Sequence, residues 1–157
     1  MGIDKKEASF KLLNKYIIHL ILTDTCGQER ARVVMDNYYS KSDCIILSYD
    51  ITNRYSFEEC KSYYCEKIKI LCKPKVKTML LGNKKDLNNQ REVRYKEASD
   101  FALSNEYMFI ETSCKTYENL YEAFEKIIEV AFEEIHKKEL IKNNYDANKK
   151  KPKCNII

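Results

Sequence analysis

The sequence predicts an α/β fold in which a doubly wound, mostly parallel sheet carries helices on both faces. Two observations support this prediction. The short runs 44–49 and 77–81 are almost uniformly apolar, which is typical of parallel strands that are covered on both sides. Amphipathic segments of helical spacing alternate with these runs, and such strand-helix alternation builds a parallel sheet. The length of 157 residues is that of one domain.

The first half of the chain begins with a hairpin and continues through a strand into a helix. Two strands near 7–13 and 16–22 are predicted as the hairpin, because the tight Asn14-Lys15 turn separates them. A capping box at Ser56-Phe57-Glu58-Glu59 predicts the start of the helix, which should stop before Pro74 because proline ends a helix.

The second half continues the alternation. A helix is predicted over roughly 95–104 and a final strand over 108–112. The long segment 118–140 places apolar residues at helical spacing, so we expect its apolar stripe to pack on the sheet. The sequence then becomes polar and lysine-rich, and residues 142–157 are predicted to form a disordered tether. The folded domain is therefore expected to span 1–141.

Composition and charge exclude several classes of protein. Hydrophobic residues make up 44% and charged residues 33% of the chain, and no apolar run reaches the roughly 18 residues of a membrane-spanning helix. The net charge is +4, but residues 137–157 hold seven Lys against two acidic residues, a local +5 that leaves −1 on the remaining body. We therefore expect no nucleic-acid binding. Separately, we expect a monomer. The seven cysteines form no Cys-x-x-Cys pair and suit free thiols in a reducing cytosol.

Three short polar segments follow predicted strands, at the edge of the sheet where ligands bind in folds of this class. The first is Asp24-Thr25-Cys26-Gly27-Gln28-Glu29. Its residue types suit phosphoryl transfer. Asp24 could hold a Mg²⁺ ion through water, the backbone N–H of Gly27 could meet the terminal phosphate, and Gln28 could orient the attacking water.

The second segment is Asn83-Lys84-Lys85-Asp86, after the strand at 77–81. Asp86 would accept two hydrogen bonds from the N1–H and the exocyclic amine of guanine, and adenine lacks these donors. Lys84 would lay its aliphatic stem along the face of the ring, and Asn83 would tie the loop to its neighbours. The same four residues also suit an ordinary polar turn, so this segment alone leaves both interpretations open.

The third segment, Glu111-Thr112-Ser113-Cys114-Lys115, ends the final strand. The backbone N–H of Cys114 could donate to O6 of the base, and Ser113 and Lys115 flank it in the same loop. Three such loops in this order, each after a strand, favour a site for GTP or GDP with Mg²⁺ over three unrelated turns.

On these residues the sequence resembles the Ras superfamily of small GTPases, and above all its Rab branch. The resemblance covers nearly the whole chain and includes Tyr38-Tyr39, Tyr49-Asp50-Ile51-Thr52-Asn53 with Ser56-Phe57, and Leu81-Gly82. It implies the small GTPase form of the P-loop NTPase fold, GTP hydrolysis, and a switch role in vesicular transport. It also implies effector and regulator proteins as partners, on the cytoplasmic face of an intracellular membrane and in exchange with the cytosol.

The same alignment would place the first strand, the Gly-x-x-x-x-Gly-Lys-Ser/Thr phosphate loop, the first helix and a Mg²⁺-binding threonine before Met1. Family topology would put that strand at the centre of the sheet, between 16–22 and 44–49. We therefore expect two unpaired apolar edges. The chain should then be unstable and inactive in hydrolysis alone, unless the recorded sequence is incomplete at its N-terminus. Two hypotheses follow. One is a Rab-type GTPase switch, and the other is a pseudo-GTPase that serves as a prenylated, membrane-tethered binding module with little or no GTP binding.

The final residues carry a further signal. Cys154-Asn155-Ile156-Ile157 approximates a Cys-aliphatic-aliphatic-X prenylation site, preceded by Lys149, Lys150, Lys151 and Lys153. One lipid binds a membrane marginally, but a lipid with four lysines at anionic headgroups, each contributing about 1 kcal/mol, makes an anchor. The alternative is a basic tail that ends in Cys by chance. We expect lipidation at Cys154, by either a farnesyl or a geranylgeranyl group.

Overall fold

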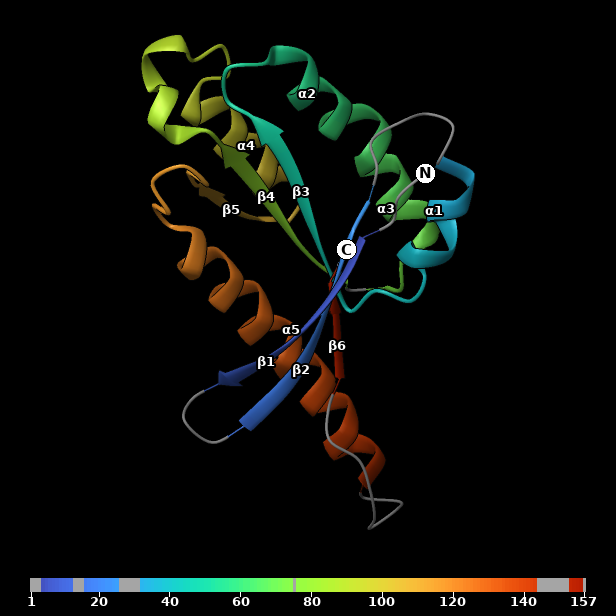
Figure 1. The fold of residues 1–157 in the computed structure, drawn as a ribbon. Coiled ribbons are helices and arrows are strands. Elements are labelled where there is room, and N and C mark those ends of the chain that lie inside the picture. The colour runs from blue at the N-terminus through green and yellow to red at the C-terminus, as the bar shows by residue number, and fades with distance from the viewer. Residues whose placement is uncertain (1–3, 13–15, 26–31, 75, 144–152, 157) are drawn as a thin grey trace.

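The computed structural model of this chain describes residues 4–12, 16–25, 32–74, 76–143 and 153–156. Their strands form one sheet in the order β1-β2-β6-β3-β4-β5, and helices cover both faces (Figure 1). The strands are β1 Asp4–Leu12, β2 Tyr16–Asp24, β3 Cys44–Asp50, β4 Lys77–Asn83, β5 Met108–Glu111 and β6 Lys153–Ile156. The helices are α1 Arg32–Tyr39, α2 Arg54–Glu59, α3 Cys65–Leu71, α4 Tyr95–Ser104 and α5 Leu120–Asn143. A π-helical turn, Cys60–Tyr64, joins α2 to α3, and a 3₁₀ turn spans Lys85–Gln90.

The predicted fold class, a mostly parallel α/β sheet, is confirmed. β1 and β2 form the expected antiparallel hairpin, with Asp4 opposite Asp24. Every other pair of neighbouring strands in the described part of the chain is parallel. β3 pairs with β4 along its whole seven-residue length, from Cys44 to Asp50. The carboxyl ends of these two strands therefore lie side by side.

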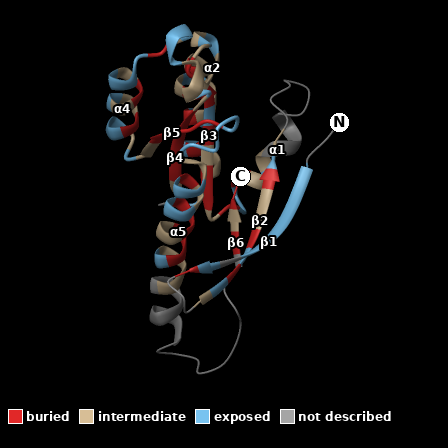
Figure 2. Cartoon of the chain, turned by 60° about the vertical axis from the view of Figure 1, so that its left-hand side comes forward, coloured by how far each residue is buried: buried red, intermediate tan, exposed pale blue. Residues whose placement is uncertain are grey.

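Successive residues of the central strands pack into two different cores, one on each face of the sheet. In β4, Met79 and Leu81 pack with Ile127 of α5, whereas Leu80 between them packs with Phe57 of α2. Figure 2 shows buried residues along β3, β4 and β5. Because side chains alternate between faces along a strand, covering both faces requires the continuous apolar runs that the sequence displays.

The helix that follows β3 begins earlier than the sequence predicted. Its N-cap is Asn53, whose side-chain oxygen accepts a hydrogen bond from the backbone N–H of Ser56 at 3.2 Å. Ser56, the predicted cap, lies inside the helix and donates through Oγ to the Asn53 carbonyl at 2.7 Å, so the predicted capping box is wrong. Asn and Ser both suit an N-cap, and the choice depends on how the chain leaves β3. Among the described helices, none is both long and apolar enough to cross a membrane.

The centre of the sheet holds a strand that the sequence did not predict. β6 lies between β2 and β3 and runs parallel to both, pairing with β2 as far as Leu22 and with β3 at Cys44. It occupies the position that the family resemblance assigns to a strand before Met1. We expected two unpaired strand edges here. That prediction is wrong for the residues of β2 and β3 that pair with β6.

The prediction of a disordered tether over 142–157 is also wrong for residues 153–156, which form β6. α5 extends to Asn143, and residues 144–152 lie outside the described part of the chain. Alternate side chains of β6 are buried. Cys154 and Ile156 enter the core beside α5, and each is 1% exposed. Four residues with a central Asn and a neighbouring lysine run are too short a pattern to predict a strand.

Candidate functional site

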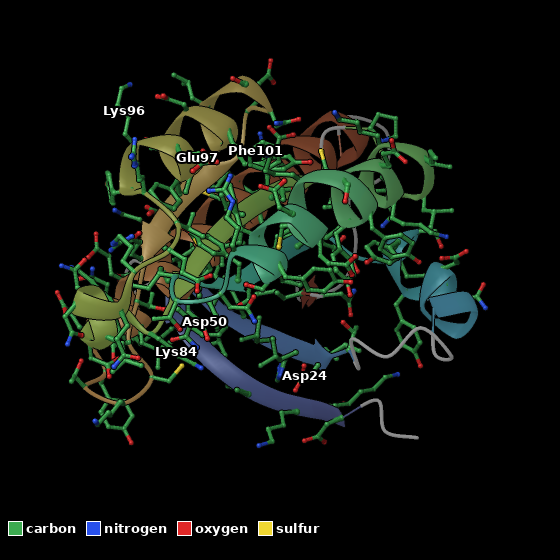
Figure 3. All side chains as sticks on the ribbon, turned by 90° about the horizontal axis from the view of Figure 1, so that it is seen from above. Asp24, Asp50, Lys84, Lys96, Glu97 and Phe101 are labelled. Carbon is green, nitrogen blue, oxygen red and sulfur yellow. The ribbon has the colours of Figure 1, made fainter. Side chains whose placement is uncertain are left out.

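The carboxyl ends of β2, β4 and β5 lie at one edge of the sheet, as expected for the three predicted loops. Asp24 ends β2 and Asn83 ends β4, and both line a cavity of about 600 Å³ that also contacts Cys114, from the loop after β5. In the view onto this edge, Asp24, Asp50 and Lys84 lie on the same side of the molecule (Figure 3). The cavity continues between β2 and β3 beyond the last residues of β6.

Asn83 joins the two loops that were predicted to read a base. Its Oδ1 accepts hydrogen bonds from the backbone N–H of Lys84 at 2.7 Å and from that of Cys114 at 3.3 Å. The backbone N–H of Lys85 donates to the Thr112 carbonyl at 3.0 Å. Asn83 therefore ties its loop to the neighbouring loop, as we expected. The N–H of Cys114, predicted to donate to a base oxygen, donates to Asn83 here.

Asp86 lies on the 3₁₀ turn and faces Ser113. The hydroxyl of Ser113 donates to Asp86 Oδ1 at 2.6 Å and accepts from the backbone N–H of Thr116 at 3.1 Å. Lys84 enters the turn with φ of 66°, a left-handed conformation that is uncommon outside glycine and marks a sharp change of chain direction. Asp86 and Cys114 thus belong to two hydrogen-bonded loops, and the expected convergence of these loops is confirmed.

Asp50 holds the ammonium group of Lys84, although sequence reasoning assigned Asp50 no role. Lys84 Nζ lies 2.6 Å from Asp50 Oδ2, and Asp50 Oδ1 accepts from the backbone N–H and the hydroxyl of Thr52 at 2.8 and 2.7 Å. Partial burial raises the pKa of Asp50, but the hydrogen bonds from Lys84 and Thr52 outweigh burial and leave the pKa below its usual value. The motif Tyr49-Asp50-Ile51-Thr52-Asn53 was the signal that could have identified it.

A buried ion pair links the two loops that were predicted to read a base. The guanidinium of Arg91 forms two hydrogen bonds to the carboxylate of Glu111, at 2.6 and 2.7 Å, and the Glu111 side chain is 3% exposed. The side-chain amide of Asn119 donates to the Glu111 carbonyl at 2.8 Å. Arg91 follows the turn of Asp86, and Asn119 ends the loop of Cys114, so Glu111 holds both loops. Sequence reasoning missed this pair; an acidic residue in an apolar strand was the available signal.

Gly82 permits close packing under these loops. A Cβ atom at this position would lie 2.8 Å from the hydroxyl of Tyr49 and 3.1 Å from Cγ of Glu111. Tyr49 is fully buried, and no described residue forms a hydrogen bond with its hydroxyl. Burial raises the pKa of that hydroxyl, and the negative charge of the nearby Glu111 carboxylate raises it further. Only a residue without a side chain leaves room for the Tyr49 ring here.

Asp24, the predicted metal ligand, is exposed at the end of β2 and lines the cavity. One carboxylate suits Mg²⁺, which usually keeps several waters and takes phosphate oxygens as further ligands. The residues that the structure describes contain no group of three or more His, Cys, Asp or Glu side chains that could hold a metal without such help. Asp24 thus fits Mg²⁺ only together with the phosphates of a nucleotide.

The other predicted site residues fall into two groups. Lys115 is exposed beside Cys114 in the loop after β5. Gly27 and Gln28, predicted to contact the terminal phosphate and the attacking water, lie outside the described residues. Their predicted roles stay predictions.

Cys154, the predicted lipidation site, lies in β6. It is 1% exposed, and its Sγ lies 4.0 Å from Sγ of Cys44. The hydrogen-bonding contact with Cys154, followed by burial, raises the pKa of the Cys44 thiol. Lys149, Lys150 and Lys151 lie outside the described residues, and Lys153 begins the strand. Lipidation of Cys154 stays a prediction, and in this conformation its thiol faces the core.

The sequence of this chain is similar to those of known proteins. The sequence model of the Ras family matches residues 1–133. Ras-related protein Rab-4B of Rattus norvegicus is 42% identical over 123 residues, which is 78% of this chain and 57% of that protein. Ras-related protein Rab-2B of Dictyostelium discoideum is 41% identical over 131 residues, 82% of this chain and 63% of that protein. The matched part is thus 57–63% of the length of these relatives.

Proposed function

The chain belongs to the Ras family, on its Rab branch, and from this premise we propose that it reads the guanine base of GTP and GDP in a Rab-type switch of membrane traffic. The observation that carries the proposal is the meeting of two loops at one sheet edge, through the hydrogen bonds of Asn83 to Cys114 and of Ser113 to Asp86. Because these loops come from neighbouring parallel strands, their spacing is set by the sheet.

Asp86 selects the base in this proposal. Its carboxylate accepts hydrogen bonds from the N1–H and the exocyclic amine of guanine. The bond from Ser113 to Oδ1 orients the carboxylate and still leaves acceptor sites, because a carboxylate has about four. Adenine offers neither donor and would leave a charged acceptor unpaired, which is costly. Selection thus comes from the penalty on the wrong base.

The neighbouring residues position the ring. With its ammonium held by Asp50, the aliphatic stem of Lys84 would cover one face of the base. The backbone N–H of Cys114, in a long 3.3 Å bond to Asn83, can exchange that partner for O6 of guanine. Ser113 holds Asp86, and Lys115 adds positive charge beside the pocket. These are the roles that the sequence predicts for the four residues.

The phosphate end of the site is also a proposal, because this chain aligns with only about three fifths of the length of its relatives. Asp24 would share Mg²⁺ with the phosphates, and Gly27 and Gln28 would contact the terminal phosphate and the attacking water. When bound, Mg²⁺ supplies neutralisation of the phosphate charge. The roles of all three residues are the basis on which we propose GTP hydrolysis.

The membrane end of the proposal depends on Cys154 and on the lysines before it. A prenyl group on Cys154, with Lys149, Lys150, Lys151 and Lys153 facing anionic lipids, would hold the protein on the cytoplasmic face of an intracellular membrane. Removal from the membrane would return it to the cytosol. Effectors and regulators of Rab type are its proposed partners, and nucleic acid is not among them.

Base reading can be tested without phosphates. Guanosine and adenosine compete for the purified chain in ligand-observed nuclear magnetic resonance. We expect guanosine to bind about a hundredfold better than adenosine, because two hydrogen bonds to a carboxylate are at stake. Asp86→Asn should remove this preference and favour xanthosine, whose carbonyl replaces the amine. Asp100→Asn, on the exposed surface of α4, is the matched control. Equal binding of guanosine by wild type and Asp86→Asn would overturn the proposal.

A second series separates the switch from the pseudo-GTPase. Affinity is measured for guanosine, GDP and GTP, each with and without Mg²⁺. A switch predicts affinity that rises with each phosphate, depends on Mg²⁺ and falls in Asp24→Asn. A binding module that reads only the base predicts the same affinity for all three ligands. For a switch, Gln28→Leu should also slow phosphate release without changing GDP affinity.

A further inference from the structure

β6 connects two parts of the sheet that do not pair with each other. Within the described residues, the β1–β2 hairpin reaches β3 only through this strand, which pairs with β2 over four residues and with β3 at Cys44. Figure 2 shows β6 between β2 of the hairpin and β3. The strand at the centre of this sheet is therefore the last one in the chain.

Specific contacts hold β6 in place. The backbone N–H and the side-chain amide of Asn155 both donate to Oδ2 of Asp43, at 2.9 and 3.0 Å. In return, the backbone N–H of Asp43 donates to the Asn155 carbonyl at 2.8 Å. Cys154 and Ile156, on either side, are buried in the core beneath α5. Asp43 therefore holds β6 at Asn155, and the two flanking side chains add apolar burial.

The buried residue at the centre of these contacts is also the proposed lipid acceptor. Thioether formation requires the Cys154 thiolate to attack C1 of an isoprenyl diphosphate. The carbon-sulfur bond forms as the carbon-oxygen bond breaks, inorganic diphosphate leaves, and the thiol proton passes to solvent. An enzyme that catalyses this transfer must surround the sulfur, whereas the sulfur here lies against Cys44 inside the sheet.

We propose that β6 masks the lipidation site, so that the closed sheet and lipidation at Cys154 exclude each other. The chain then exists in two states. In the closed state, residues 153–156 complete the sheet and no lipid can be attached. In the open state, these residues leave the sheet and become available to a prenyltransferase. The lipidation in this inference rests on the proposed function. The burial of the Cys154 thiol is independent of it.

Opening would also affect the other end of the molecule. β2 carries Asp24 at its carboxyl end, and its pairing with β6 extends from His19 to Leu22, two residues before Asp24. When β6 leaves, the hairpin loses its strand connection to β3, and Asp24 loses its fixed relation to the base-reading loops. Lipidation and the geometry of the phosphate end are therefore linked through one strand.

Thiol labelling tests the masking directly. The native chain is treated with N-ethylmaleimide, and mass spectrometry of peptides follows each cysteine. Cys114 is exposed and serves as the internal standard. We expect Cys154 to react at least about tenfold more slowly than Cys114, and Asp43→Ala to speed its labelling about tenfold, since a charged acceptor of two hydrogen bonds is lost. Lys73→Ala removes the other partner of Asp43, an ion pair of 3.6 Å, and should leave the rate unchanged.

Asn155→Ala provides a second route, because it removes one donor and leaves Asp43 in place. Retained protection of β3 and β4 amides in hydrogen exchange shows that the variants remain folded. Labelling of Cys154 as fast as Cys114 in the native chain would overturn the masking. So would an unchanged rate in both the Asp43 and Asn155 variants.

Prenylation is then measured with purified transferases and labelled farnesyl or geranylgeranyl diphosphate. We expect incorporation into Asp43→Ala to exceed that into wild type by the same factor as the maleimide rate. Wild type modified as fast as Asp43→Ala would contradict the inference. If no variant accepts a lipid, including the free peptide of residues 149–157, the lipidation part of the proposed function fails, and the maleimide result alone decides the masking.

Discussion

The two ends of the candidate site stand on parts of the sheet that are held in different ways. The loops that we propose to read the base follow β4 and β5, which pair directly with each other, and β4 pairs with β3 along seven residues. Asp24 instead ends a hairpin that reaches β3 only through the four residues of β6, among the described strands. Directly paired strands therefore position the proposed base-reading loops, whereas a short inserted strand positions Asp24.

This difference teaches that the two tasks can be perturbed separately. Changes within β3, β4, β5 and their loops should lower global stability and disturb the proposed reading of the base. Changes in β6 should loosen the hairpin while the directly paired strands remain folded. The four predictions below test that separation, in order of decreasing effect.

The largest effect is expected from Arg91→Met. This change leaves the carboxylate of Glu111 buried without its partner, which should cost about 4 kcal/mol of unfolding free energy. Chemical denaturation monitored by circular dichroism measures the loss. Arg94→Met, at an exposed position three residues on, is the matched control and should change stability by less than about 0.5 kcal/mol. Equal losses in both variants would show that the buried pair does not hold the two loops.

Ile156→Ala should have the next largest effect, and a local one. Truncating this buried side chain removes apolar contact from β6 and should cost about 3 kcal/mol. Hydrogen exchange should then show faster opening of β2 amides while β4 amides keep their protection. Ile70→Ala, at a 75% exposed position on α3, is the control. Equal loss of protection in β2 and β4 would mean that the two parts of the sheet open together.

Gly82→Ala should destabilise the directly paired part by about 2 kcal/mol, because the new methyl group meets the ring of Tyr49. Tyr49→Phe should be close to neutral in stability, since its hydroxyl has no hydrogen-bond partner among the described residues. The double variant should recover part of the loss, because the atom nearest to the added Cβ has gone. Additive losses in this double-mutant cycle would contradict the packing argument.

The smallest effect is expected from Asp50→Asn, which weakens the bond to Lys84. At neutral pH the wild type should be more stable by about 0.5–1 kcal/mol. The folded-state pKa of Asp50 is lowered, so this contribution is complete above the ordinary pKa of 3.8 and is lost as the pH falls through the folded value. Unfolding free energies of both proteins between pH 7 and pH 3 measure the difference. A gap that stays constant below pH 4 would argue against a charged Asp50 as the partner.

Much of the candidate site was predictable from the sequence because its information is local. Asn83, Asp86 and Cys114 each follow an apolar run at a fixed short distance, and parallel strands bring such loops to one edge. The pair of Arg91 with Glu111 was not predictable in the same way. Its partners are twenty residues apart, and the residues around Arg91 give no indication that Glu111 is its partner.

The sequence by itself determined the alternation of strands and helices, the two-sided burial of β3 and β4, and the order of the polar loops. These features follow from the spacing of apolar residues over a few positions, which can be read directly from the sequence. Only the tertiary structure decided that residues 153–156 fill the centre of the sheet, beside a strand that ends more than a hundred residues earlier. A strand needs partners for its backbone groups, and the choice among distant partners depends on which edge remains open after the rest of the chain has packed.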